Sequence, residues 1–289
     1  MKTRIVQDEP APAPEHRPNL VQRHPLVTFF VLAFAISWCL LPFGTFLPPG
    51  PLVAALVVIS ATQGVAGLKR LGSRLIRWRV GWRWYAAAVG VPIAMAFTSI
   101  GANMGLGAPS PSWDQYSAWY SVFMVFGLNM VMPLFGPLGE EPGFRGFALP
   151  ALQSRRSPLM ASAILAALVV AWHVPLVLIP SFDLAPIELV ATVAVTFWYT
   201  WLFNHTGGSI LLTLVAHSAE GVVNTHDLWP NGVSETREAW MYALAWSVMA
   251  IGLVVFDRKA WIAAPRSATD LTVAETETSG YRPSHGVRG

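Results

Sequence analysis

The stretch PLMASAILAALVVAWHVPLVLIP, residues 158–180, decides the fold of this chain. It holds no Asp, Glu, Lys or Arg, and as a helix rising about 1.5 Å per residue it is long enough to cross a hydrocarbon core of roughly 30 Å. Open strands would leave unpaired backbone groups in lipid, and the sequence lacks the alternation that a barrel needs. Seven similar apolar runs lie near residues 26–47, 51–68, 84–105, 118–138, 186–204, 208–225 and 239–256. We therefore predict an all-α polytopic membrane protein, a bundle of about eight transmembrane helices.

The composition agrees with this fold class. Of 289 residues, 54% are hydrophobic and 12% charged, against roughly 25% charged in ordinary soluble domains, and the mean hydropathy is +0.48. These values exclude a disordered chain, a collagen and a charged coiled coil. The single cysteine, Cys39, excludes an intrachain disulfide.

The chain divides into a membrane domain and two tails. Residues 1–24 are polar and Pro-rich, and residues 257–289 lose apolar content and gain Ser, Thr, Glu and Arg. Both are predicted to be disordered cytosolic tails. Residues 25–256 form the predicted eight-span domain.

The basic residues predict the orientation. With eight spans, all but one of the 19 Lys and Arg residues share a side with the two termini, and the exception is Arg237. Because Lys and Arg accumulate on the cytosolic side, both termini are predicted to be cytosolic in a multi-pass protein, for which we expect a bacterial plasma membrane. The segment LKRLGSRLIRWRVGWRW, residues 68–84, interleaves Arg with Trp, which is typical of an interfacial helix that contacts anionic lipid headgroups. No nucleic-acid partner is expected.

Ionisable side chains within spans are hypotheses for function, because each costs at least about 2.5–3.5 kcal/mol on insertion scales. His205 is predicted to be interfacial, and Glu188 lies at the outer edge of its run. Acidic residues of the short outer loops are predicted to be solvated: Asp114, Asp183, Asp227, Glu235 and Glu238. The ionisable residues within the predicted spans are Glu140, Glu141, His173, His217 and Glu220.

Those residues suit hydrolysis in a confined site. The chain has no HExxH, GxSxG, P-loop or GxGxxG motif. An acidic pair and two histidines on three helices nevertheless supply a general base together with a second proton-transfer group or an oxyanion donor.

Three segments resemble the CPBP intramembrane protease family, which includes the CAAX prenyl endopeptidases and the bacterial Abi proteins. GEEPGFRGFALPALQ, residues 139–153, is similar to the first motif, EExxxR. VVAWHVPL contains the second-motif histidine, His173, and GGSILLTLVAHSAEG contains the third-motif histidine, His217. The resemblance covers about residues 120–225.

The resemblance implies specific roles. Glu140 would be the general base that polarises a water together with His173, and His217 would stabilise the oxyanion. Glu141 and Arg145 stand at i and i+4 and are expected to pair on a helix. The family also implies a cavity open toward the cytosolic side, cleavage near the cytosolic membrane face, and a membrane-associated peptide or protein, with or without a lipid anchor, as substrate.

The chain departs from the family pattern at three places. Val169 replaces an aromatic residue, and Gly221 stands where the third motif usually has Asn, one turn after the histidine. Glu220 could orient that histidine, and Asn224 is the nearest amide on about the same face. Pro142 directly follows the acidic pair and predicts a kinked or restarted helix there.

Three functions remain open at this point. The first is an intramembrane endopeptidase, the second a non-catalytic Abi-type scaffold or bacteriocin self-immunity protein, and the third a proton-coupled transporter. The family is commonly described as metalloproteases, and Glu140, His173 and His217 could complete a zinc site. We favour a site without a metal cofactor.

Overall fold

The structure, a computed structural model, describes residues 19–116, 118–182, 184–223, 225, 228–229 and 232–265. Helices are the only regular elements within these ranges. Short 3₁₀ turns and one π-helical turn interrupt the longer helices. The α-helices are α1 (Leu20–Arg23), α2 (Pro25–Trp38), α3 (Gly50–Leu75), α4 (Trp82–Gly105), α5 (Tyr120–Val131), α6 (Pro137–Gly143), α7 (Leu149–Gln153), α8 (Pro158–Leu178), α9 (Glu188–His205), α10 (Ile210–Val222), α11 (Val233–Phe256) and α12 (Arg258–Trp261). The predicted all-α membrane fold is confirmed.

Five helical segments are long and apolar enough to cross a membrane: Pro25–Phe43, Gly50–Leu75, Trp82–Gly105, Pro158–Leu178 and Val233–Phe256. The other three predicted runs contain α5, α9 and α10. The helix α10 has 13 residues, about 20 Å at 1.5 Å per residue, which is shorter than a hydrocarbon core. A total of eight spans therefore stays a prediction.

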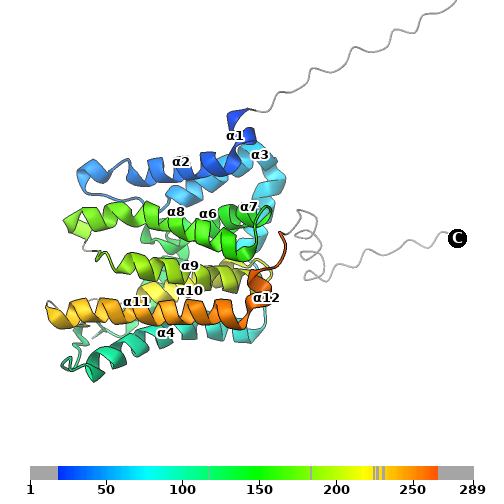
Figure 1. The fold of residues 1–289 in the computed structure, drawn as a ribbon. Helices are drawn as coiled ribbons and strands as arrows, with labels where there is room; N and C mark the ends of the chain where they lie inside the picture. Colours follow the sequence, from blue (N-terminus) through cyan, green and yellow to red (C-terminus); the bar gives the residue numbers. More distant parts are fainter. Residues whose placement is uncertain are drawn as a thin grey trace, which may run out of the picture.

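The helices pack as a bundle around α10. In Figure 1, α2, α8, α9 and α11 lie one below another, and α4 lies beside α11. The helix α10 contacts α4, α5, α6 and α9. It therefore brings the third-motif histidine to the centre of the bundle.

One end of the bundle carries the basic connections, and we call it the basic end. At Gly64 the backbone has φ 59° and ψ −154°, a combination that needs glycine, and it separates α3 into two helical parts. In Figure 1 the part after this kink turns across the end of the bundle, where α1 and α12 also lie. Ser209 Oγ donates to the Arg77 carbonyl over 2.7 Å, and His205 Nε2 lies 2.9 Å from Asp257 Oδ2. His205 therefore belongs to this end.

The opposite end holds the remaining connections, and we call it the far end. The Phe46 ring packs against Phe182 with centroids 6.4 Å apart, which joins the α2–α3 connection to the α8–α9 connection. Trp229 Nε1 donates to the Pro109 carbonyl over 2.9 Å, which joins the α10–α11 connection to the α4–α5 connection.

The structure corrects three predictions about polar segments. Asn19 and Gln22 form a capping box at the start of α1, so the inner end of the first tail is helical. Trp261 in α12 is buried and its Nε1 donates to the Leu253 carbonyl, which orders the start of the second tail. Glu238, predicted to be solvated, is buried in α11 and accepts from Ser99 Oγ over 2.9 Å. Residues 1–18 and 266–289 lie outside the described ranges.

Candidate functional site

The first motif lies on a helix that begins later than predicted. The expected continuous run over 118–138 is wrong, because α5 ends at Val131 and the backbone leaves helical geometry at Met132. Gly136, with φ 100°, precedes the new helix α6. A restart at Pro142 itself is not seen: α6 runs through Pro142 to Gly143, and the predicted irregularity takes the form of a π-helical turn, Phe144–Ala148, that leads into α7. Such π turns frequently occur at functional sites.

Two glycines allow this helix to approach α3 closely. A Cβ at Gly139 would meet the carbonyls of Pro133 and Pro48, and a Cβ at Gly143 would meet the carbonyl of Pro51. These obstacles are backbone atoms, which cannot rotate away. Glycine at both positions therefore lets the acidic pair reach the interior of the bundle.

A buried ionic network anchors the site. Glu141 is fully buried, and its Oε1 accepts from Arg145 Nη1 over 2.9 Å, as the i, i+4 spacing predicts. The same oxygen lies 2.9 Å from Nδ1 of His217 on α10. The Arg145 guanidinium also stands over the Tyr199 ring, 4.8 Å from its centroid. Glu141 therefore connects the first motif to the third-motif histidine.

The candidate catalytic residues line one cavity of about 250 Å³. Glu140 reaches it from the first turn of α6, where the positive end of the helix dipole favours a carboxylate. His173 reaches it from α8, and His217 and Glu220 reach it from α10. The walls further include Val169, Leu184, Glu188, Thr192, Tyr199 and Tyr242. Arg145 also lines this cavity, so the structure brings together five of the site residues singled out from sequence, and the cavity is large enough for several waters.

The hydrogen bonds of the two histidines determine which ring nitrogen is available. His173 Nδ1 lies 2.9 Å from the Val169 carbonyl, which accepts only, so Nδ1 carries the proton and a neutral ring leaves Nε2 as an acceptor. In His217, Nδ1 donates to Glu141, so Nε2 is again the free nitrogen. The Val169 bond uses the backbone, so it does not depend on the aromatic side chain usual in the family at that position.

Glu220 and the Gly221 position have partners that sequence reasoning missed. Tyr242 on α11 donates its hydroxyl to Glu220 Oε1 over 2.7 Å. A Cβ at Gly221 would lie 3.1 Å from Nδ2 of Asn129, a buried amide on α5. The signal for Asn129 was a lone amide in an apolar helix. Asn224, singled out from sequence, lies outside the described residues.

The zinc alternative does not fit the geometry. Within the described ranges, no three His, Cys, Asp or Glu side chains are grouped so that they could hold a metal ion. Glu140, His173 and His217 therefore share a cavity without forming a ligand set.

A comparison with known families finds a match within the membrane core. Residues 119–223 match the family described as type II CAAX prenyl endopeptidase Rce1-like. This segment, residues 119–223 of the membrane core, is similar to that family. The Rce1-like segment runs from the start of α5 to the end of α10 and contains all three motifs, and several apolar helices make the protein an integral membrane protein. No curated protein matches the chain.

The position of the cavity conflicts with one pair of sequence-based expectations. Both termini were predicted to be cytosolic, and the cavity was expected to open toward the cytosol. Leu184 and Glu188, which line the cavity, belong to the α8–α9 connection and the start of α9 at the far end. The first and last described helices, α1 and α12, lie at the basic end, so the two expectations conflict.

Proposed function

We propose that this Rce1-like protein is an intramembrane endopeptidase that hydrolyses a peptide bond with a glutamate- and histidine-activated water. The observation that carries the proposal is the convergence of Glu140, His173 and His217, from three separate helices, on one cavity. Burying ionisable groups in a membrane protein is costly, and such groups mark functional pathways. A network that additionally fixes His217 through Glu141 favours a defined geometry over a diffuse proton relay.

The chemistry follows from the atoms that face the cavity. Glu140, assisted by Nε2 of His173, takes a proton from water, and the resulting hydroxide attacks the carbonyl carbon of the peptide. When His217 carries protons on both nitrogens, the Glu141 carboxylate neutralises the ring, and Nε2–H donates to the oxyanion. The tetrahedral intermediate collapses, the C–N bond breaks, and the proton returns to the leaving amine. Arg145 is a positioning residue: its ion pair holds Glu141, which in turn holds His217.

Gly221 is the specific observation that favours a second function, a non-catalytic scaffold. The amide expected one turn after His217 is missing from α10, so the oxyanion would have one donor from that helix. Asn129 lies next to the vacant Cβ position, 3.1 Å away, which supplies an amide from α5 near that place. We favour the enzyme because the base, the second histidine and the anchored third histidine are all present.

The variant Glu140→Gln tests the proposal. It keeps the shape of the side chain and removes the base, so cleavage should fall by roughly 10²–10⁴-fold. The readout is the set of new peptide termini in membranes of cells that express the wild type or the variant, followed by cleavage of those peptides by purified protein. His173→Gln should give the same loss. The matched control is Asp114→Asn, an exposed carboxylate outside the cavity, which should leave cleavage unchanged.

Two outcomes would contradict the enzyme. Cleavage that is undiminished in Glu140→Gln would remove the assigned base. If Glu140→Gln restores the phenotype of a deletion strain as well as the wild type does, the protein acts as a scaffold.

A further inference from the structure

The depth of the candidate site along the helices is the starting point. His173 lies five residues before the end of α8 at Leu178, about 8 Å along the axis, and fifteen residues, about 22 Å, from its start at Pro158. His217 likewise lies five residues before the end of α10 at Val222. The helix α8 starts at the basic end and finishes at the far end. His173 therefore lies in the half of the bundle next to the far end, and His217, about midway along the shorter α10, shares its cavity.

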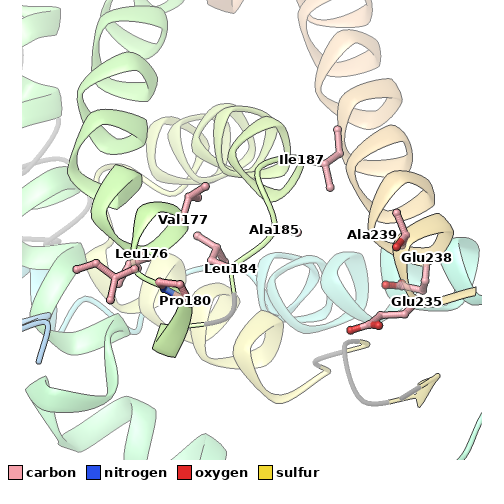
Figure 2. A pocket seen from close by; sticks show the side chains of 11 residues that line it. Leu176, Val177, Pro180, Leu184, Ala185, Ile187, Glu235, Glu238 and Ala239 are labelled. Carbon is pink, nitrogen blue, oxygen red and sulfur yellow. The ribbon is translucent and has the colours of Figure 1, made fainter. Parts of the chain in front are cut away.

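A second cavity of about 410 Å³ lies at the far end and shares Leu184 with the cavity of the candidate site. Figure 2 shows its lining: apolar side chains of the α8–α9 region, among them Val177, Leu184 and Pro180, lie on one side, and Glu235 and Glu238 of α11 lie on the other. Leu184 is therefore a common wall of the candidate site and a cavity at the far end.

The two ends of the bundle differ in charge. Arg74 and Arg77 lie beside the glycines of the α9–α10 turn at the basic end, and α12 adds Arg258 and Lys259. In the part of the chain that the structure describes, the far end has one Lys or Arg, Arg237, which donates to Asn103 Oδ1 and to the Leu106 carbonyl. Among the described residues, the acidic side chains of the far end are those of Asp114, Glu188, Glu235 and Glu238. Because positive loops are retained in the cytosol, this asymmetry places the basic end in the cytosol.

We infer that the catalytic cavity opens on the extracytosolic side of the membrane and takes peptide segments presented from that side. That these peptides are cleaved rests on the proposed function, whereas the side on which the cavity opens does not. The inference replaces the expectation of a cytosolic opening. A lipidated tail of a cytosolic protein would meet the basic end, while an extracytosolic or outer-leaflet segment would meet the end where Glu188 and Glu235 line the two cavities.

Cysteine labelling tests the inference without any need for cleavage. Cys39, the single cysteine, is exposed at the end of α2, at the far end of the bundle. In a Cys39→Ser background, Thr192→Cys places a thiol on the cavity wall, and Ser73→Cys places an exposed thiol at the basic end. Intact cells and inverted membrane vesicles carrying the full chain are treated with a small, membrane-impermeant methanethiosulfonate. Each variant is first checked for a thermal unfolding curve like that of the wild type.

In intact cells we expect the reagent to label Cys39 and Thr192→Cys but not Ser73→Cys. In inverted vesicles we expect it to label Ser73→Cys but neither Cys39 nor Thr192→Cys. Labelling of Ser73→Cys in intact cells, with Thr192→Cys reacting only in inverted vesicles, would overturn the inference. Labelling of Thr192→Cys and Ser73→Cys from the same side would also overturn it. A chain that labels as expected but cleaves nothing would refute the proposed function alone.

Discussion

The buried pair of Glu141 and Arg145 gives the sharpest prediction about stability. The side chains are 0% and 3% exposed, and their charged atoms are 2.9 Å apart. Replacing Arg145 by Met keeps a long apolar side chain but leaves the Glu141 carboxylate without its cation, with the hydrogen bond to His217 remaining. Removing one member of a buried pair costs about 3–5 kcal/mol, because the other charge stays desolvated.

The assay is thermal unfolding in detergent, followed by the fluorescence of the 13 tryptophans. A loss of that size corresponds to a fall in melting temperature on the order of 10 °C. The control Lys69→Met removes one positive charge from an exposed position and should change stability by less than about 0.5 kcal/mol.

The double variant Glu141→Gln with Arg145→Met isolates the cause. It removes both charges, so it should be more stable than Arg145→Met alone, with a coupling energy of about 0.5–3 kcal/mol. The reasoning fails if Arg145→Met unfolds at the same temperature as Lys69→Met. It also fails if the double variant is less stable than the two single variants added together.

Three further predictions concern packing and cofactor content. Gly143→Ala should destabilise by at least about 1–3 kcal/mol, because its Cβ would meet the Pro51 carbonyl, whereas Gly90→Ala has no atom within 4 Å and should be neutral or stabilising in the same melting assay. Gly221→Asn should destabilise alone and recover when combined with Asn129→Gly, because both side chains need the same space; equal melting temperatures of the single and double variants would contradict this. Dialysis against a chelator should leave melting and cleavage unchanged, and stoichiometric zinc by elemental analysis would show that the ligand geometry was misjudged.

Local features were readable from sequence because they depend on neighbours along the chain. Apolar runs predicted the helical membrane fold, since a helix satisfies its own backbone groups in lipid. The spacing of Glu141 and Arg145 predicted their pair, since residues four apart share one helix face. The ordered motifs singled out Glu140, His173 and His217.

Helix ends and turns were less predictable. The break at Met132 to Gly136 interrupts the run 118–138, which hydropathy reads as continuous. Hydropathy averages over many residues, so it does not register a change in the backbone at one glycine. Glu238 was assigned to solvent because it lies near a chain turn, and only the packing of α11 against α4 brings it to Ser99.

By itself, the sequence determined the helical membrane fold, the candidate catalytic residues and the concentration of basic residues in loops predicted to share a side with the termini. Only the tertiary structure decided that Glu141 holds His217, that Asn129 lies beside Gly221, and that the cavity lies in the half of the bundle remote from the basic loops. The physical reason is distance along the chain. Those contacts join residues that are 76 and 92 positions apart, and no helical period connects them until α10 packs between α4, α5, α6 and α9.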